Sequence, residues 1–142
     1  MDNQEELVAR VVRDARVVAV IGAQGEDQRH KSAYSIPDVM HARGIRIIPV
    51  NPKLSSAFGE RALGSVLELR EKVDVVQIFR RSELVPPHVD EILAMPAEVR
   101  PDVVWLQTGI VHEGGAAKLR AAGIGVIMDR CFAVEMSRYG RR

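Results

Sequence analysis

Five short apolar runs alternate with amphipathic segments along the chain. The runs are rich in Val and Ile and do not alternate with polar residues, which is typical of parallel strands that are covered on both faces. They predict strands over 17–21, 45–50, 73–79, 102–107 and 124–129. The amphipathic segments predict helices over 3–14, 34–43, 64–70, 86–95 and 112–122.

The regular succession of strand and helix predicts one α/β domain over residues 1–142, built on a doubly wound parallel sheet. Right-handed crossovers leave few topologies, and we expect five strands in the order 3-2-1-4-5. The chain contains no linker, repeat or low-complexity segment, and only the tail at about 137–142 is expected to fray.

The overall charge gives no reason to expect a nucleic-acid or membrane partner. Lys and Arg number 20 and Asp and Glu 19, for a net charge of +1, so any anion site must be local. The N-terminus does not have the pattern of a signal peptide, and no apolar run is long enough to span a bilayer. The single cysteine, Cys131, excludes an intramolecular disulfide and fits a reducing compartment, so we expect the cytoplasm.

In an open α/β sheet, ligands bind beyond the carboxyl ends of the strands, where the strand order reverses. In the expected order this point lies between the first and fourth strands. The loop after the first strand begins with Gly22, which would let a phosphate approach the backbone, and leads to a helix N-terminus that favours anions. Lys31 adds a positive charge, and Ser32 or Ser35 could cap the helix. Neither a GxGxxG fingerprint nor a Walker loop is present, so a plain strand-to-helix turn is the alternative.

The loop after the second strand carries no carboxylate. An NAD site usually has Asp or Glu there to hold the ribose hydroxyl, whereas this chain has Asn51, Pro52 and Lys53. This set suits a ribose that bears a phosphate, and NADP is one such ligand. The alternative is an exposed lysine on a turn.

The next two loops add an aromatic ring, two cations and an apolar wall. Phe79 could stack on adenine, and Arg80 and Arg81 could bind phosphate; core packing and a surface salt bridge are the alternatives. Gly109 and Ile110 would form a narrow wall that suits an extended arm with amide groups.

Five segments together resemble one known family, the small stand-alone CoA-binding proteins. They are VVAVIGAQGEDQRHKSAY, IIPVNPK, VDVVQIFRRSE, VWLQTGIVHE and VIMDRC, and the likeness extends over about residues 14–135. That family shares its fold with the CoA-binding domain of the succinyl-CoA synthetase α subunit and of ADP-forming acyl-CoA synthetases. The resemblance therefore implies a Rossmann-like domain that binds coenzyme A, or acyl-CoA, at the carboxyl edge of the sheet.

The resemblance also implies a place for each matching residue along the ligand. The diphosphate would be surrounded by Gly22, Ala23, Lys31 and Ser32. The remaining positions follow the ligand outward, with Pro52 and Lys53 by the adenosine and its 3′-phosphate, Phe79 and Arg80 beside the adenine, and Gln107, Gly109 and Ile110 along the pantetheine.

Two departures from the family pattern stand out. Glu26 and Asp27 occupy the first loop, where they would repel a diphosphate unless they point outward. Met136 follows Glu135 where the family usually has His, so any role of that histidine is absent here.

The sequence shows no catalytic constellation and no metal-ligand spacing. His30 and His112 fall in loops at the carboxyl edge, but no carboxylate at a fixed spacing marks either one. Cys131 could form a mixed disulfide with a ligand thiol, or it could be a small buried residue next to an Asp129–Arg130 pair.

We therefore expect a module that binds a small nucleotide ligand without catalysis of its own, either alone, as a homodimer or with a protein partner. The alternatives are an NADP-dependent reductase on a minimal domain and a partner-binding protein whose nucleotide site has decayed.

Overall fold

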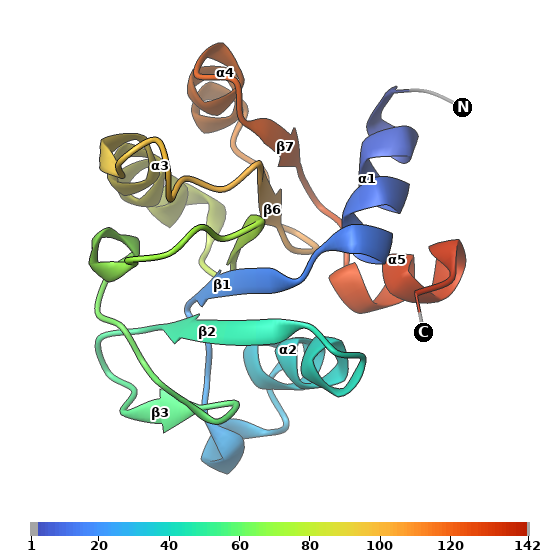
Figure 1. Cartoon of the computed structure of the whole chain (residues 1–142), viewed down its shortest axis with the longest axis vertical. Helices are drawn as coiled ribbons and strands as arrows, with labels where there is room; N and C mark the ends of the chain where they lie inside the picture. Colours follow the sequence, from blue (N-terminus) through green and yellow to red (C-terminus); the bar gives the residue numbers. More distant parts are fainter. Residues whose placement is uncertain (1–2, 142) are drawn as a thin grey trace.

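A five-stranded parallel sheet forms the centre of this computed structural model, which describes residues 3–141 (Figure 1). Every neighbouring pair of strands in the sheet is parallel. The predicted fold class, a doubly wound α/β Rossmann-like domain, is confirmed. The strands are β1 (Val17–Ile21), β2 (Arg46–Val50), β5 (Val75–Ile78), β6 (Val103–Leu106) and β7 (Gly125–Ile127).

The third parallel strand, β5, takes a different place from the one expected. The observed order is β2-β1-β5-β6-β7, so the strands counted along the chain run 2-1-3-4-5, whereas 3-2-1-4-5 was expected. In a right-handed crossover, the side on which the next strand joins the sheet determines which face of the sheet the connection covers. The handedness rule does not say on which side that strand joins. The connection from β2 to β5 buries Val66 and Leu69 on the face opposite α2 (Ser32–Ala42), and this brings β5 to the far side of β1. The strand order therefore reverses between β1 and β5.

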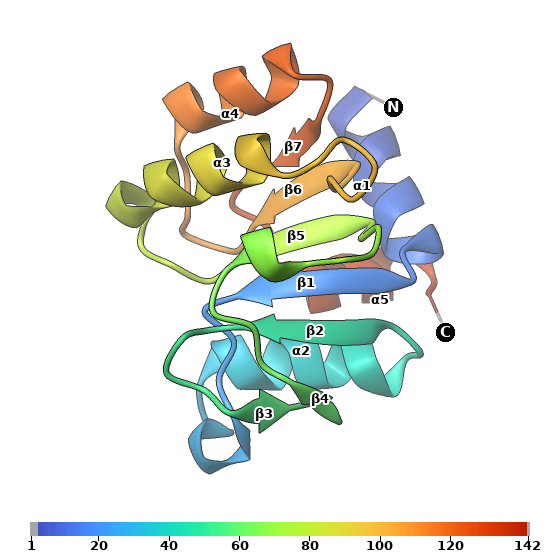
Figure 2. The same ribbon diagram turned by 60° about the vertical axis from the view of Figure 1, so that its left-hand side comes forward.

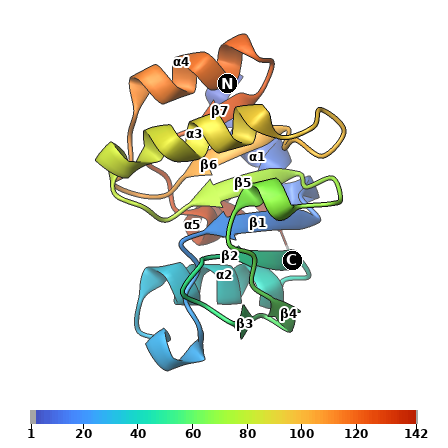
Figure 3. The ribbon, with the colours of Figure 1, turned by 90° about the vertical axis from the view of Figure 1, so that its left-hand side faces the viewer.

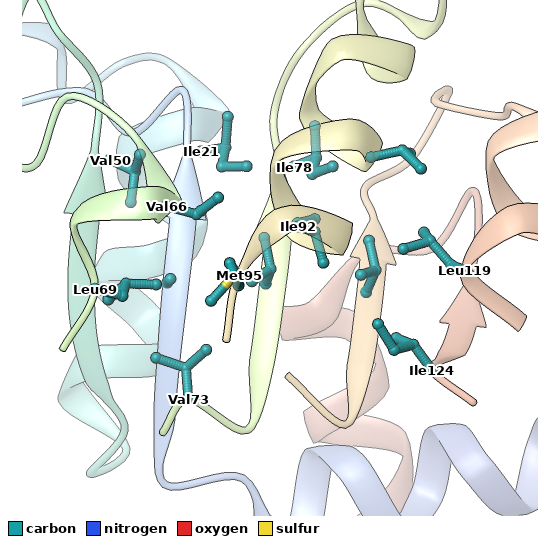
Figure 4. Close-up of a cluster of buried hydrophobic side chains, with 14 of the residues drawn as sticks. Ile21, Val50, Val66, Leu69, Val73, Ile78, Ile92, Met95, Leu119 and Ile124 are labelled. Carbon is teal, nitrogen blue, oxygen red and sulfur yellow. The ribbon is translucent and has the colours of Figure 1, made fainter. Parts of the chain in front are cut away.

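Helices cover both faces of the sheet (Figures 1, 2 and 3). On one face, a buried cluster includes Met40, Trp105 and Phe132. The ring centroids of Trp105 and Phe132 lie 4.5 Å apart. On the other, the cluster includes Ile78 and Ile92 (Figure 4). Burial on both sides explains why the strands read as unbroken apolar runs. The first cluster is covered by α1 (Asn3–Asp14), α2 and α5 (Phe132–Tyr139), and the second by α3 (Val85–Ala94), α4 (Glu113–Ala121) and the 3-10 turn η2 (Val66–Glu68).

A small antiparallel hairpin, which the sequence pattern did not predict, follows β2. Its strands, β3 (Ser56–Ala57) and β4 (Glu60–Arg61), are joined by Phe58 and Gly59, both at positive φ. Two-residue turns of this kind usually carry Asn-Gly or Asp-Gly, so Phe-Gly gave no signal. The Phe58 ring stacks on Tyr34 of α2 at a centroid distance of 5.2 Å, which holds the hairpin against the domain.

The outer edge of β2 is covered by the chain that follows the hairpin. The Leu63 N–H donates to the Pro49 carbonyl, and the Asn51 N–H donates to the Leu63 carbonyl. Leu63 thus forms a parallel bridge with Val50 at this edge.

Helix α5 occupies the region where a loop and a fraying tail were expected. It runs to Tyr139 and ends at Gly140, whose φ of 88° is typical of a helix-ending glycine. It packs against α1 through Glu5, which accepts hydrogen bonds from Arg130 and from the Tyr139 hydroxyl. Arg130, and then Tyr139, hold the pKa of Glu5 well below its usual range, at about 2.

We expect the variant Glu5→Gln to lose stability in a way that depends on pH. Because the pKa of Glu5 is lower in the folded chain, ionised Glu5 contributes fully above its ordinary value of 4.5, and the contribution is lost as the pH falls towards 2. Urea unfolding of both proteins at several pH values should therefore show a difference in unfolding free energy that is largest near pH 6 and shrinks towards pH 2. The exposed neighbour variant Glu6→Gln is the control, and a Glu5→Gln difference that does not change with pH would contradict the assignment.

Candidate functional site

Two adjoining cavities lie along the carboxyl edge of the sheet. The first, here called the β2 cavity, has a volume of about 300 Å³ and opens between the loops after β1, β2 and β5. The second, the β6 cavity, has a volume of about 520 Å³ and opens between the start of α2 and the loops after β5 and β6. Phe79 and Arg80 line both cavities and so form the boundary between them.

The structure brings the candidate residues together, with the exception of Ala23. Ala23 is fully buried and lines neither cavity. The β2 cavity is lined by Gly22, Asn51, Pro52, Lys53, Phe79 and Arg80 among the candidates, and the β6 cavity by Lys31, Ser32, Phe79, Arg80, Arg81, Gln107, Gly109 and Ile110.

Gly22 is required by the packing of the backbone. Its φ is 85°, and a Cβ atom built on it would lie 2.6 Å from the Phe79 carbonyl oxygen. No side chain fits at that distance, so glycine lets the ends of β1 and β5 come together. The sequence had suggested that Gly22 makes room for a phosphate, but the group that takes this room is the Phe79 carbonyl.

Asn51 ties the first two loops to each other. Its side-chain amide donates to the Ala23 carbonyl at 2.9 Å, and its carbonyl oxygen accepts from the Lys53 N–H at 2.9 Å. Through these two hydrogen bonds the Asn51 side chain shapes the β2 cavity and positions the backbone of Lys53.

Three cations line the two cavities without a carboxylate partner. Among residues 3–141, no ion pair within 4.0 Å involves Lys31, Lys53 or Arg80. Arg81, in contrast, pairs with Glu83 at 3.3 Å, and both side chains are exposed. These three residues therefore bring positive charge to the cavities without an ion-pair partner, and Glu91 is the carboxylate that also lines the β2 cavity.

The acidic residues of the first loop lie outside the cavities, and the start of α2 adds to the positive electrostatic potential beside the β6 cavity. Glu26 and Asp27 are exposed in the 3-10 turn η1 (Glu26–Gln28) and line neither cavity. The helix begins earlier than expected, at Ser32, and its N-cap position is Lys31, whose side chain caps nothing. Neither Ser32 nor Ser35 is the cap, and Ser32 instead lies in the first turn beside the β6 cavity, where a helix N-terminus favours an anion.

Gln107 faces partly into the protein. It is 5% exposed, and its side-chain carbonyl accepts from the Gln77 amide at 3.0 Å and from the Phe132 N–H at 3.4 Å. The side chain thus connects the floor of the β6 cavity with the start of α5.

A polar cluster in the β2 cavity was missed at the sequence level. Ser65 donates its hydroxyl to Glu91 at 2.6 Å, and the Nδ1 atom of His88 lies 3.0 Å from the other Glu91 oxygen. His88 and Glu91 are three residues apart on α3 and so share a helix face, which could have been read from the sequence. Ser65 could not, because it comes from the segment before η2. The β2 cavity is also lined by Ile21, Gln24, Val50 and Gly64, which were not among the candidate residues.

The remaining histidines and the cysteine lie outside the two cavities. His112 is the N-cap residue of α4, and its side chain accepts a hydrogen bond from the Gly115 N–H at 2.9 Å. A Cβ atom on Gly115 would lie 3.0 Å from the Val89 side chain, which explains why glycine occupies this position. Cys131 is the N-cap residue of α5, and its position does not support a mixed disulfide with a ligand in either cavity.

In residues 3–141, no group of three or more His, Cys, Asp or Glu residues could hold a metal ion. No helix within this range is long and apolar enough to cross a membrane.

The fold and the cavities at its carboxyl edge are those of a Rossmann-like binding domain. The chain belongs to the CoA binding domain family, whose model matches residues 16–137.

Known proteins resemble the chain over nearly its whole length. The uncharacterized protein YneT of Bacillus subtilis (strain 168) is 33% identical over 127 residues, which cover 89% of this chain and 90% of YneT. The structure of cell-free ID.343 from Thermus thermophilus is 35% identical, with a TM-score of 0.86, and the match covers 98% of this chain and 99% of that one.

A larger enzyme shares the fold. The dinucleotide-forming acetyl-coenzyme A synthetase 1 of Ca. Korarchaeum cryptofilum has a TM-score of 0.64 and 20% identity, over 84% of this chain and 26% of the synthetase chain. At this identity the likeness shows the fold alone.

We expect the variant Gly22→Ala to destabilise the protein more than Gly44→Ala does. Both glycines have positive φ, but a Cβ atom meets nothing within 4 Å at Gly44 and the Phe79 carbonyl at Gly22. The conformation should cost about 1–2 kcal/mol at each position, and crowding should add about 1–3 kcal/mol at Gly22. Thermal unfolding measures the difference, and equal losses for the two variants would show that the end of β5 moves aside easily.

Proposed function

We propose that the chain binds coenzyme A, free or acylated, along the carboxyl edge of its sheet and performs no catalysis of its own. The adenosine and its 3′-phosphate occupy the β2 cavity, the diphosphate lies by the start of α2, and the pantetheine arm crosses the β6 cavity. A reducing compartment such as the cytoplasm suits a chain whose one cysteine is free.

The observation that carries this proposal is the set of unpaired cations around two joined cavities. Coenzyme A is a long ligand with phosphates at two separate points, and it needs a groove with positive charge at more than one place. Lys53 lies in the β2 cavity, Lys31 in the β6 cavity, and Arg80 between them. Charge-assisted hydrogen bonds to phosphate are roughly twice as strong as neutral ones.

The apolar lining supports the arm and the ring of the same ligand. Pro52 and Phe79 give the β2 cavity flat apolar surfaces for a base, and Ile110 with Gly109 gives the β6 cavity a narrow wall for an extended chain. Membership of the CoA binding domain family supports a coenzyme A ligand over other phosphorylated nucleotides.

The arrangement of Ser65 and His88 favours binding over catalysis. Both side chains hydrogen-bond to Glu91, and among residues 3–141 no hydrogen bond joins Ser65 to His88, whereas a serine nucleophile is activated by a direct bond to its base. Glu26 and Asp27 are exposed and line neither cavity, so they do not oppose a phosphate there, which supports a binding site over a decayed one.

We expect coenzyme A to stabilise the protein more than related nucleotides do. A ligand that binds only the folded state raises the unfolding midpoint with the logarithm of its concentration over Kd. In a thermal-shift series at equal concentrations, coenzyme A should give the largest shift, dephospho-coenzyme A a smaller one, and NADP and NAD less still. A shift with NADP ahead of coenzyme A would support the reductase alternative, and no shift with any of the four would contradict the proposal.

The variant Lys53→Ala should weaken coenzyme A binding specifically through the 3′-phosphate. Loss of one charge-assisted bond predicts a cost of about 1–2 kcal/mol, or roughly 5–30-fold in Kd. Affinity for dephospho-coenzyme A should change little in a titration calorimetry experiment. The control is Lys72→Ala, because Lys72 pairs with Asp102 at the opposite edge of the sheet. Equal losses for the two ligands would place the 3′-phosphate elsewhere.

A further inference from the structure

The β2 cavity contains one carboxylate, and it lies on a different element from the cations. Glu91 belongs to α3, whereas Lys53 follows β2 and Arg80 follows β5. The Glu91 and His88 side chains are only 30% and 17% exposed. Positive and negative charge thus line different walls of the same cavity.

Glu91 is held in place from two directions. Ser65, which precedes η2, donates to one carboxylate oxygen, and His88 on α3 contacts the other. An ionised carboxylate can only accept hydrogen bonds, so the Nδ1–H tautomer of His88 is the one that donates to Glu91 in this contact. Ser65 is itself fixed, since its hydroxyl accepts the Leu67 N–H at 3.1 Å. The carboxylate therefore has a defined orientation before any ligand arrives.

The carboxylate keeps unused capacity to accept. Its two oxygens offer about four lone-pair sites, and Ser65 and His88 occupy one on each oxygen. A group that completes the site must donate N–H or O–H bonds and must carry no negative charge, because a phosphate would be repelled.

We infer that Glu91 accepts a hydrogen bond from the 6-amino group of adenine and makes the β2 cavity selective for that base. This inference rests on the proposed binding of coenzyme A, whose adenine carries an uncharged N–H donor of this kind. Glu91 is the specificity residue, and Ser65 and His88 position it. The same carboxylate keeps phosphates out of this end of the cavity and so sets the direction in which the ligand lies.

Calorimetric titration with coenzyme A, and with an analogue in which unsubstituted purine replaces adenine, tests the inference. The wild type should bind coenzyme A about tenfold or more tightly than the purine analogue, as expected for a hydrogen bond to a charged group. Glu91→Ala should bind the two ligands about equally. Asp90→Ala is the matched control, because it removes an exposed carboxylate from the same helix and should keep the tenfold preference.

Each outcome separates this inference from the proposed function. If the wild type binds coenzyme A without a preference over the purine analogue, or if Glu91→Ala keeps the preference, the inference is overturned and coenzyme A binding stands. If the wild type binds neither ligand, both fall. Should Glu91→Ala not fold, Glu91→Met keeps the length of the side chain and removes both acceptor oxygens, and an unchanged preference in that variant overturns the inference.

Discussion

The ends of β1 and β5 approach each other so closely at Gly22 that the Phe79 carbonyl fills the place of a side chain. This contact fixes the distance between the loops that follow the two central strands. Phe79 and Arg80 therefore stand at the boundary of the two cavities and line both of them. The position of the site depends on backbone packing first, and its side chains add charge and shape to a groove that the sheet has already defined.

Charge is divided across this groove in a way that suits an asymmetric ligand. The cations come from the loops after the strands and from the start of α2, and the one carboxylate comes from α3. Neither set neutralises the other, because Glu91 bonds to Ser65 and His88 while Lys53 has no acidic partner in the part of the chain that the structure describes. Opposite charges kept apart in this way can select both the composition of a ligand and its direction.

The sequence predicted the elements better than their arrangement. The first strand, 17–21, is observed over Val17–Ile21 and the first helix over Asn3–Asp14, because period and propensity are local properties. The place of β5 depends on which face the segment from 51 to 72 covers, and that is a long-range property. Helix α5 had a local signal that was not used, since Phe132 and Met136 are four apart and Gly140 follows the helix.

The same distinction between local and long-range properties applies to the residues of the candidate site. Residues that directly follow strands, such as Lys53 and Arg80, could be predicted, since the carboxyl ends of parallel strands meet at one edge. Ser65 and Glu91 belong to elements whose contact arises only in the folded chain. The role of Gly22 was also out of reach, because it depends on a carbonyl 57 residues away in the sequence.

The bridge between Leu63 and β2 has a consequence for how copies of the protein meet. Unpaired strand edges invite other chains to add a strand, which leads to aggregation. Here the open edge of β2 is occupied by the protein's own backbone, and Pro49 within it has no N–H to offer. At the opposite margin, β7 is only three residues long. Self-association by continuation of the sheet is thus disfavoured at both margins, which leaves helices and loops as the better surfaces for contact between copies.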